Sequence, residues 1–204
     1  MSAIVDALKA DHDTLIELLV QHEPSMAQVM ESTLAKVLLL ATASELEAEV
    51  QRIIIDFYAE TTGGHDVAIS FVRNKAIERQ FHTYFSWERS NANSFFGPFG
   101  AELKAHADAA VKSSADLAQA IRDFIQLGAL RNQLVHQNYA MFTLSATAND
   151  IYAWYQSAFR FVDALPALLR LEQPSLTTAD TSSESAPDPE PEAPSCGDAG
   201  GPGD

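Results

Sequence analysis

The sequence predicts an all-α fold, an antiparallel helical bundle with a disordered acidic C-terminal tail. Apolar residues recur every three or four positions through most of the first 172 residues, as on the buried face of a helix. The connections between these segments are short, which favours antiparallel neighbours. From residue 173 onward the chain is rich in Pro, Ser, Thr, Asp, Glu and Gly and cannot bury enough apolar surface to fold. We therefore expect a helical domain at residues 1–172 and a tail at residues 173–204.

Two helices open the predicted domain. Ser2 caps the first, which extends to about residue 21 and is followed by Pro24. The second spans about residues 26–61 and is apolar over much of its circumference, so we expect it to form the spine of the core. A pair of glycines at positions 63 and 64 ends it.

The middle of the chain has a less regular pattern. Residues 66–88 are aromatic and mostly helical in their spacing, although apolar residues alternate over residues 66–72 and leave a strand there as an alternative. Residues 90–100 contain a Gly-Pro pair and a further glycine. They predict a loop whose three phenylalanines pack onto the core.

The last part of the domain is again helical. Three helices are predicted at residues 101–112, 115–127 and 129–141. A closing helix begins at a cap provided by Asn149 or Asp150, carries an aromatic stripe and ends before Pro166.

Charge and composition restrict the class of protein. The formal net charge is −15; seven of the acidic residues lie in the tail, which has no Lys or Arg, so residues 1–172 keep a charge of −8. This argues against a general nucleic-acid binder and requires any RNA contact to come from a small cationic site. The longest apolar run, residues 37–43, is too short to span a bilayer, and the N-terminus does not resemble a signal peptide, so we expect a cytoplasmic protein. The single Cys196 excludes an intramolecular disulfide and a thiolate metal cluster.

One short segment combines a fixed cation, an amide and an imidazole. Arg131 can clamp phosphate oxygens, and His136 can give or take a proton near neutral pH. On a helix Asn132 and His136 share a face, which Tyr139 or Ala140 continues. The opposite, inward-facing side is predicted to consist of Leu127, Leu130, Leu134 and Val135.

The R-N-x-x-x-H segment, near the end of a penultimate helix and before one closing aromatic helix, is similar to the signature of HEPN domains (higher eukaryotes and prokaryotes nucleotide-binding). The alanine-rich stretch Ala41-Thr42-Ala43-Ser44-Glu45-Leu46-Glu47 resembles one in RiboL-PSP-type and related bacterial members. The resemblance covers about residues 30–170.

The resemblance implies a function and a set of residues. HEPN domains usually form homodimers in which two such motifs share one cleft, and that composite active site cleaves RNA without a metal or another cofactor. Many bacterial members are toxins with an antitoxin partner or effectors of phage defence. Arg131 and His136 match the two signature residues, and Asn132 matches the polar residue that follows the arginine. Some members carry a tyrosine two positions after the histidine, where this chain has Asn138 and places Tyr139 one position later.

The supporting glutamate and the reaction follow from the same resemblance. Glu45 is the candidate for orienting Arg131, with Glu47 as an alternative because the register is not fixed. His136 would take the proton of a ribose 2′-hydroxyl or give one to the leaving 5′-oxygen, and the products would be a 2′,3′-cyclic phosphate and a 5′-hydroxyl.

Other patterns carry less weight. The pairs Glu78/His82 and Glu102/His106 have the spacing of a metal half-site, but no Glu-x-x-His triplet occurs and we predict no metal site. Scattered cations can form a basic track for RNA: Arg73, Lys75, Arg79 and Arg89. The alternative function is a non-catalytic HEPN-like module that binds a protein partner or a nucleotide, which the acidic charge fits better.

Overall fold

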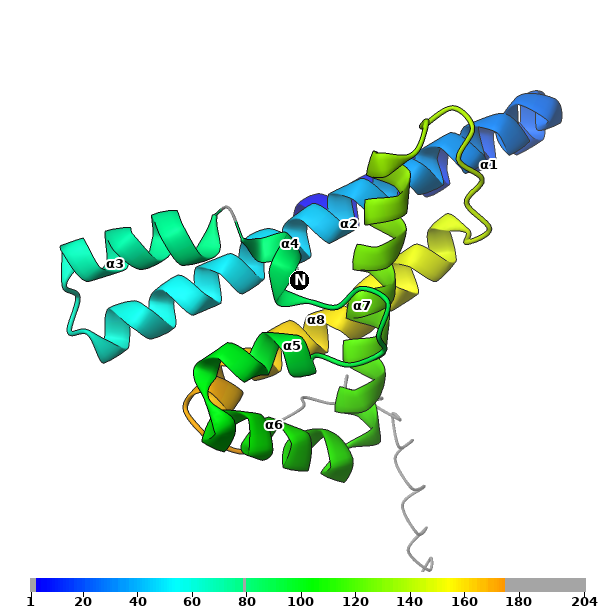
Figure 1. The fold of residues 1–204 in the computed structure, drawn as a ribbon. Helices are drawn as coiled ribbons and strands as arrows, with labels where there is room; N and C mark the ends of the chain where they lie inside the picture. Colours follow the sequence, from blue (N-terminus) through cyan, green and yellow to red (C-terminus); the bar gives the residue numbers. More distant parts are fainter. Residues whose placement is uncertain (1–2, 79, 175–204) are drawn as a thin grey trace, which may run out of the picture.

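The computed structural model describes residues 3–78 and 80–174, and these form a helical domain without a strand (Figure 1). The predicted all-α fold is therefore confirmed. The Ser2 cap and nearly all of the predicted tail lie outside the described residues. No described helix is long and apolar enough to cross a membrane.

The first two helices form an antiparallel hairpin. Helix α1 (Ala3–His22) is joined through Glu23 to the long helix α2 (Pro24–Thr61), which begins with proline in its first turn, where the missing N–H costs nothing. After α2, Gly63 and Gly64 adopt φ values of 63° and 75°. This left-handed region strains other residues, which explains why glycines end the helix.

The middle segment is helical but broken. Residues Asp66–Val72 form α3, so the alternative of a strand is wrong; the His65 side chain accepts a hydrogen bond from the Ala68 N–H and caps this helix. A π-helical turn, Arg73–Ile77, and a short α4, Phe81–Tyr84, follow in place of one continuous helix. The backbone then becomes extended at Phe85.

The predicted loop at residues 90–100 is also partly helical. It contains α5 (Asn93–Phe96) and a 3-10 turn (Gly97–Phe99). Phe95 and Phe96 are buried, and Phe99 is partly buried. Helical turns therefore carry the three phenylalanines onto the core, as the composition of the segment predicted.

Two boundaries in the last part of the domain differ from the predictions. After α6 (Ala101–Ser113), a single helix α7 (Ala115–His136) replaces the two helices predicted on either side of Gly128. Helix α8 (Ala148–Leu169) is capped by Thr147, which exchanges hydrogen bonds with Asp150. Pro166 lies inside α8 and not beyond its end, so the prediction that the helix ends before this proline is wrong. A proline there removes one helical hydrogen bond, which the packing of the buried side chains around it offsets.

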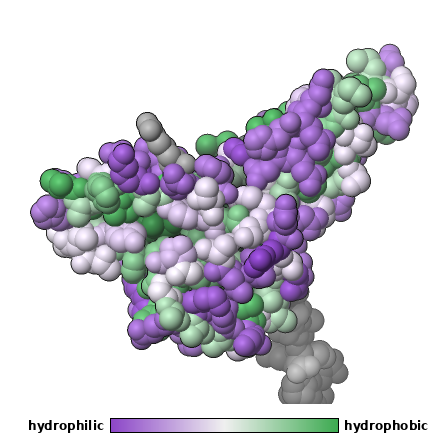
Figure 2. Space-filling model, in the orientation of Figure 1, coloured by the Kyte–Doolittle hydropathy of each residue, from purple (hydrophilic) through white to green (hydrophobic). Residues whose placement is uncertain are grey.

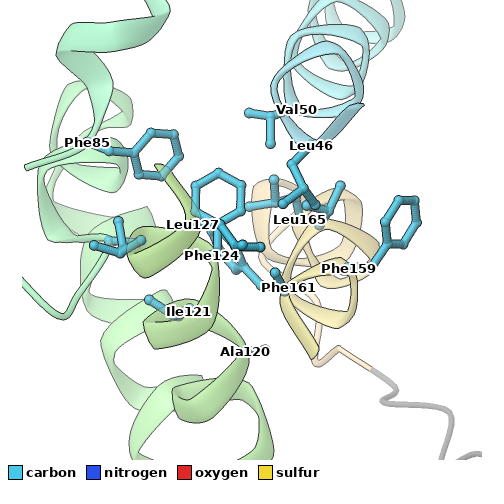
Figure 3. Packing of buried hydrophobic residues seen from close by; sticks show 14 of the residues in the cluster. Leu46, Val50, Phe85, Ala120, Ile121, Phe124, Leu127, Phe159, Phe161 and Leu165 are labelled. Carbon is cyan, nitrogen blue, oxygen red and sulfur yellow. The ribbon is translucent and has the colours of Figure 1, made fainter. Parts of the chain in front are cut away.

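The core lies where α2, α7 and α8 meet. In Figure 3 Leu46 and Val50 of α2 point toward Phe124 and Leu127 of α7 and toward Phe161 of α8, and all five side chains are buried. The rings of Phe124 and Phe161 meet edge to face, with centroids 5.2 Å apart. In Figure 1 helix α7 crosses α2 and α8 steeply. This crossing fixes the second half of α7 beside the middle of α2.

Candidate functional site

A pocket of about 500 Å³ lies beside the crossing of α2 and α7. Its polar side is formed by Arg131, Asn132 and His136 from α7, by Glu47 from α2 and by His82 from α4. The three α7 residues lie within the last two turns of the helix. The predicted Arg-Asn-His set therefore opens into a single cavity.

The guanidinium of Arg131 is held by two neighbours. Its Nη1 donates to Oδ1 of Asn132 at 3.1 Å, and its Nη2 lies 3.8 Å from Oε2 of Glu47. The other carboxylate oxygen of Glu47 accepts a hydrogen bond from Gln51 Nε2 at 3.2 Å. Both partners of the ion pair are about one-third exposed. An arginine has five N–H donors, so these contacts leave donors for a ligand.

His136 is the last residue of α7 and is exposed. Asn132 precedes it by one helical turn and lines the pocket from the same face. An imidazole at this position can reach a ligand in the pocket without a rearrangement of the core.

The structure distinguishes between the two candidate glutamates. Glu47 lines the pocket beside Arg131, whereas Glu45, two positions earlier on α2, does not line it. A separation of two residues turns a side chain about 200° around a helix, so only one of the pair can face α7.

Tyr139 lies outside the pocket lining. Helix α7 ends at His136, so the predicted stripe does not continue to this tyrosine. The backbone oxygen of Tyr139 accepts a hydrogen bond from Lys36 Nζ at 3.2 Å, and the same ammonium lies 5.1 Å from the centre of the tyrosine ring. Lys36 thereby fixes the turn after α7 to α2.

One residue on the predicted inward side of α7 is placed differently. Leu134 is buried, but Val135 is 53% exposed and lines the pocket, so the prediction that Val135 packs inward is wrong. It follows Leu134 by 100° around the helix, which is enough to leave the core.

Several residues that line the pocket were not predicted as part of the site from the sequence. The spacing of Glu78 and His82 suggested only a metal half-site, and no sequence pattern linked Phe81 or Trp87 to Arg131, yet all four line the pocket. In the described part of the chain, no group of three or more His, Cys, Asp or Glu side chains is arranged to hold a metal ion. The sequence contains only an indirect signal for Trp87. A glycine inside a predicted helix indicates that another group packs closely against it, and at Gly128 that group is the Trp87 ring.

The predicted basic track is only partly described. Arg73, Lys75 and Arg89 are exposed, and Arg79 lies outside the described residues. None of the three described cations lines the pocket, where Arg131 is the only arginine or lysine in the described lining.

Comparison with known families agrees with the predicted family and its all-α fold. The RiboL-PSP-HEPN family model matches residues 6–170, a span that runs from the first turn of α1 to the end of α8. Searches of curated proteins and of solved structures gave no match. Because the match covers most of the chain, the protein belongs to the RiboL-PSP-HEPN family.

Proposed function

We propose that this protein is a metal-independent endoribonuclease that acts as a toxin or as an effector of phage defence. The observation that carries the proposal is the convergence of Arg131, Asn132 and His136 on one pocket, with Glu47 beside the guanidinium. A cation for the phosphate and an imidazole for proton transfer are the two groups that RNA cleavage by its own 2′-hydroxyl requires.

In the proposed reaction the 2′-oxygen attacks the adjacent phosphorus and the bond to the 5′-oxygen breaks. His136 accepts the proton of the 2′-hydroxyl, and an acid supplies a proton to the leaving 5′-oxygen. Arg131 stabilises the charge that builds on the phosphoryl oxygens. Asn132 keeps the guanidinium in position through its 3.1 Å hydrogen bond. The products are a 2′,3′-cyclic phosphate and a 5′-hydroxyl.

We propose a homodimer as the active form, in which the second copy's His136 provides the acid. Exposed apolar side chains flank the catalytic end of α7: Val135 is 53% exposed and Met141 is 80% exposed. Apolar surface next to a site is typical of a protein interface. An antitoxin protein would bind over the same end.

The test is cleavage of tRNA and mRNA by purified protein in the presence of a chelator. We expect the wild type to cut and to leave a 2′,3′-cyclic phosphate, and we expect Arg131→Ala and His136→Ala each to lower the rate by about 10²–10⁴-fold. Arg122→Ala and His22→Ala are matched controls, because both residues are exposed and lie outside the pocket. Cleavage by His136→Ala at the wild-type rate would exclude this mechanism.

A second candidate function is a non-catalytic module that binds a protein partner or a nucleotide. The net charge of −15 favours it, since an acidic surface repels RNA. Absence of cleavage by the wild type on every RNA tried, with growth arrest that neither substitution relieves, would support this function instead.

A further inference from the structure

One tryptophan, Trp87, lines the apolar side of the pocket. We propose that Trp87 is a stacking platform for an unpaired base of single-stranded nucleic acid, beside a phosphate held at Arg131. This rests on the function proposed above and narrows its substrate class.

The ring of Trp87 is held in one orientation. Its Nε1 donates to the backbone oxygen of His82 at 3.0 Å. Three aromatic rings pack beside it, with centroids 5.3 Å away at Phe85, 6.3 Å away at Phe81 and 6.3 Å away at Phe124. The indole is nevertheless only partly buried and lines the pocket. A ring fixed before the ligand arrives loses little conformational freedom on binding.

A glycine on α7 makes room for this ring. A Cβ atom built at Gly128 would overlap three carbons of the six-membered part of the indole. Glycine weakens a helix interior, so its presence in the middle of a 22-residue helix fits a need for close approach. Trp87 therefore lies directly against α7.

That contact places the ring one helical turn from the phosphate-binding groups. Arg131 follows Gly128 by three positions and Asn132 follows it by four, which is about 4.5–6 Å along the helix axis. This separation is of the order of that between a base and its own phosphate. One nucleotide can therefore contact the indole and the guanidinium at the same time.

The charges of the pocket favour binding of a nucleotide through its base over binding of phosphate alone. Its lining contains one arginine and two glutamates, Glu47 and Glu78, so bare phosphate is attracted weakly. Stacking on an aromatic ring supplies affinity that does not depend on charge. A volume of about 500 Å³ lies in the range of pockets for ligands of nucleotide size. A base within a duplex has both faces covered by its neighbours, so the pocket selects unpaired nucleotides.

The experiment uses tryptophan fluorescence with a ligand that cannot react. The chain has two tryptophans, and Trp154→Phe on α8 leaves Trp87 as the only one. The probe is a 2′-deoxy hexanucleotide of mixed sequence, which lacks the attacking hydroxyl. We expect saturable quenching by the single strand and at least tenfold weaker binding of the same sequence in a duplex. Equal binding of the two forms would overturn the proposal, and binding of a mononucleotide as tight as that of the hexanucleotide would replace it with a free-nucleotide site.

Substitutions test the platform through the anisotropy of a labelled hexanucleotide. We expect Trp87→Leu to weaken binding about tenfold or more and Trp87→Phe to retain most of it. Gly128→Ala should weaken binding by displacing the ring, whereas Gly97→Ala is its control, because a Cβ at Gly97 meets nothing within 4 Å. Wild-type affinity in a folded Trp87→Leu variant would overturn the proposal. Since binding is measured without cleavage, a failure of the platform and a failure of the ribonuclease are distinguishable.

Discussion

Glu47 is the carboxylate that lies beside Arg131 in the pocket. It is the only described carboxylate in an ion pair with Arg131, at 3.8 Å, and its second oxygen is occupied by Gln51. A carboxylate in this position orients the guanidinium but also offsets its charge. Because the pair is about one-third exposed, the orienting effect is modest in energy.

We therefore expect Glu47→Gln to lower the cleavage rate by up to about 5-fold, as loss of a pair contributing up to about 1 kcal/mol would. The affinity for single-stranded oligonucleotide should stay the same or rise, because a negative charge leaves the pocket. The matched control is Glu45→Gln on the same helix, for which we expect no change in either quantity. An equal loss of rate in both variants, measured under single-turnover conditions, would contradict the assignment.

At the residue scale the sequence predicted which α7 side chains meet at the pocket, but not the lining residues from other elements. Arg131, Asn132 and His136 were found because they lie close together in the chain on one helix face. The choice between two glutamates depends on how α2 is rotated against α7, and Trp87 reaches the pocket only through tertiary packing. Spacing along one helix carries no information about either arrangement.

At the scale of single elements, the cap of α8 is the most definite feature. The Thr147 hydroxyl accepts a hydrogen bond from the Asp150 N–H at 3.1 Å, and the Asp150 carboxylate accepts one from the Thr147 N–H at 2.9 Å. The prediction of a cap at Asn149 or Asp150 was wrong by a few residues. Threonine, asparagine and aspartate all cap helices, and the position of the first turn is decided by the burial of Ala148 and Ile151.

Removal of this cap is expected to destabilise the domain. Thr147→Ala should lower the free energy of unfolding by about 1 kcal/mol at pH 7, measured by urea denaturation. Asn149→Ala is the matched control at a neighbouring exposed position and should change it little. A larger loss in the control than in Thr147→Ala would contradict the assigned cap.

The same cap predicts a pH dependence. Hydrogen bonds from the backbone and side chain of Thr147 hold the pKa of Asp150 below its ordinary value of 3.8. The unfolded chain then binds more protons than the folded one between these two pKa values, so the contribution is complete above the ordinary value and is lost as pH falls through the lowered one. Asp150→Asn should remove this part of the acid sensitivity. Unfolding curves of the wild type and Asp150→Asn between pH 7 and pH 2 should converge at the acid end.

At the scale of the whole molecule, the exposed hydrophobic residues are concentrated in a few places. Figure 2 shows a mixed surface with hydrophobic residues gathered near α3 and at the outer end of the α1–α2 hairpin. Val67 and Phe71 of α3 and Leu18 and Val29 of the hairpin are all more than half exposed.

The family, and with it the all-α fold, could be recognised from the sequence. How the helices cross could not, because crossing is set by side-chain packing between segments far apart in the chain.

A composite site makes activity depend on protein concentration. If the proposed dimer is the active form, specific activity should fall as the protein is diluted below the dimer dissociation constant, and sedimentation velocity should show monomer over the same range. Specific activity that stays constant after the protein has become monomeric would show that one chain contains the whole catalytic site.

Helix α7 continues without a break past Gly128, so it fixes the distance between the Trp87 contact and Arg131. Two separate helices joined at the glycine would allow the tryptophan end and the arginine end of the pocket to move relative to each other. One continuous helix instead fixes their spacing by its pitch, so an inserted residue between Gly128 and Arg131 would swing the guanidinium about 100° around the axis and away from the ring. The length of that short segment is therefore as strictly constrained as the identity of the residues at its ends.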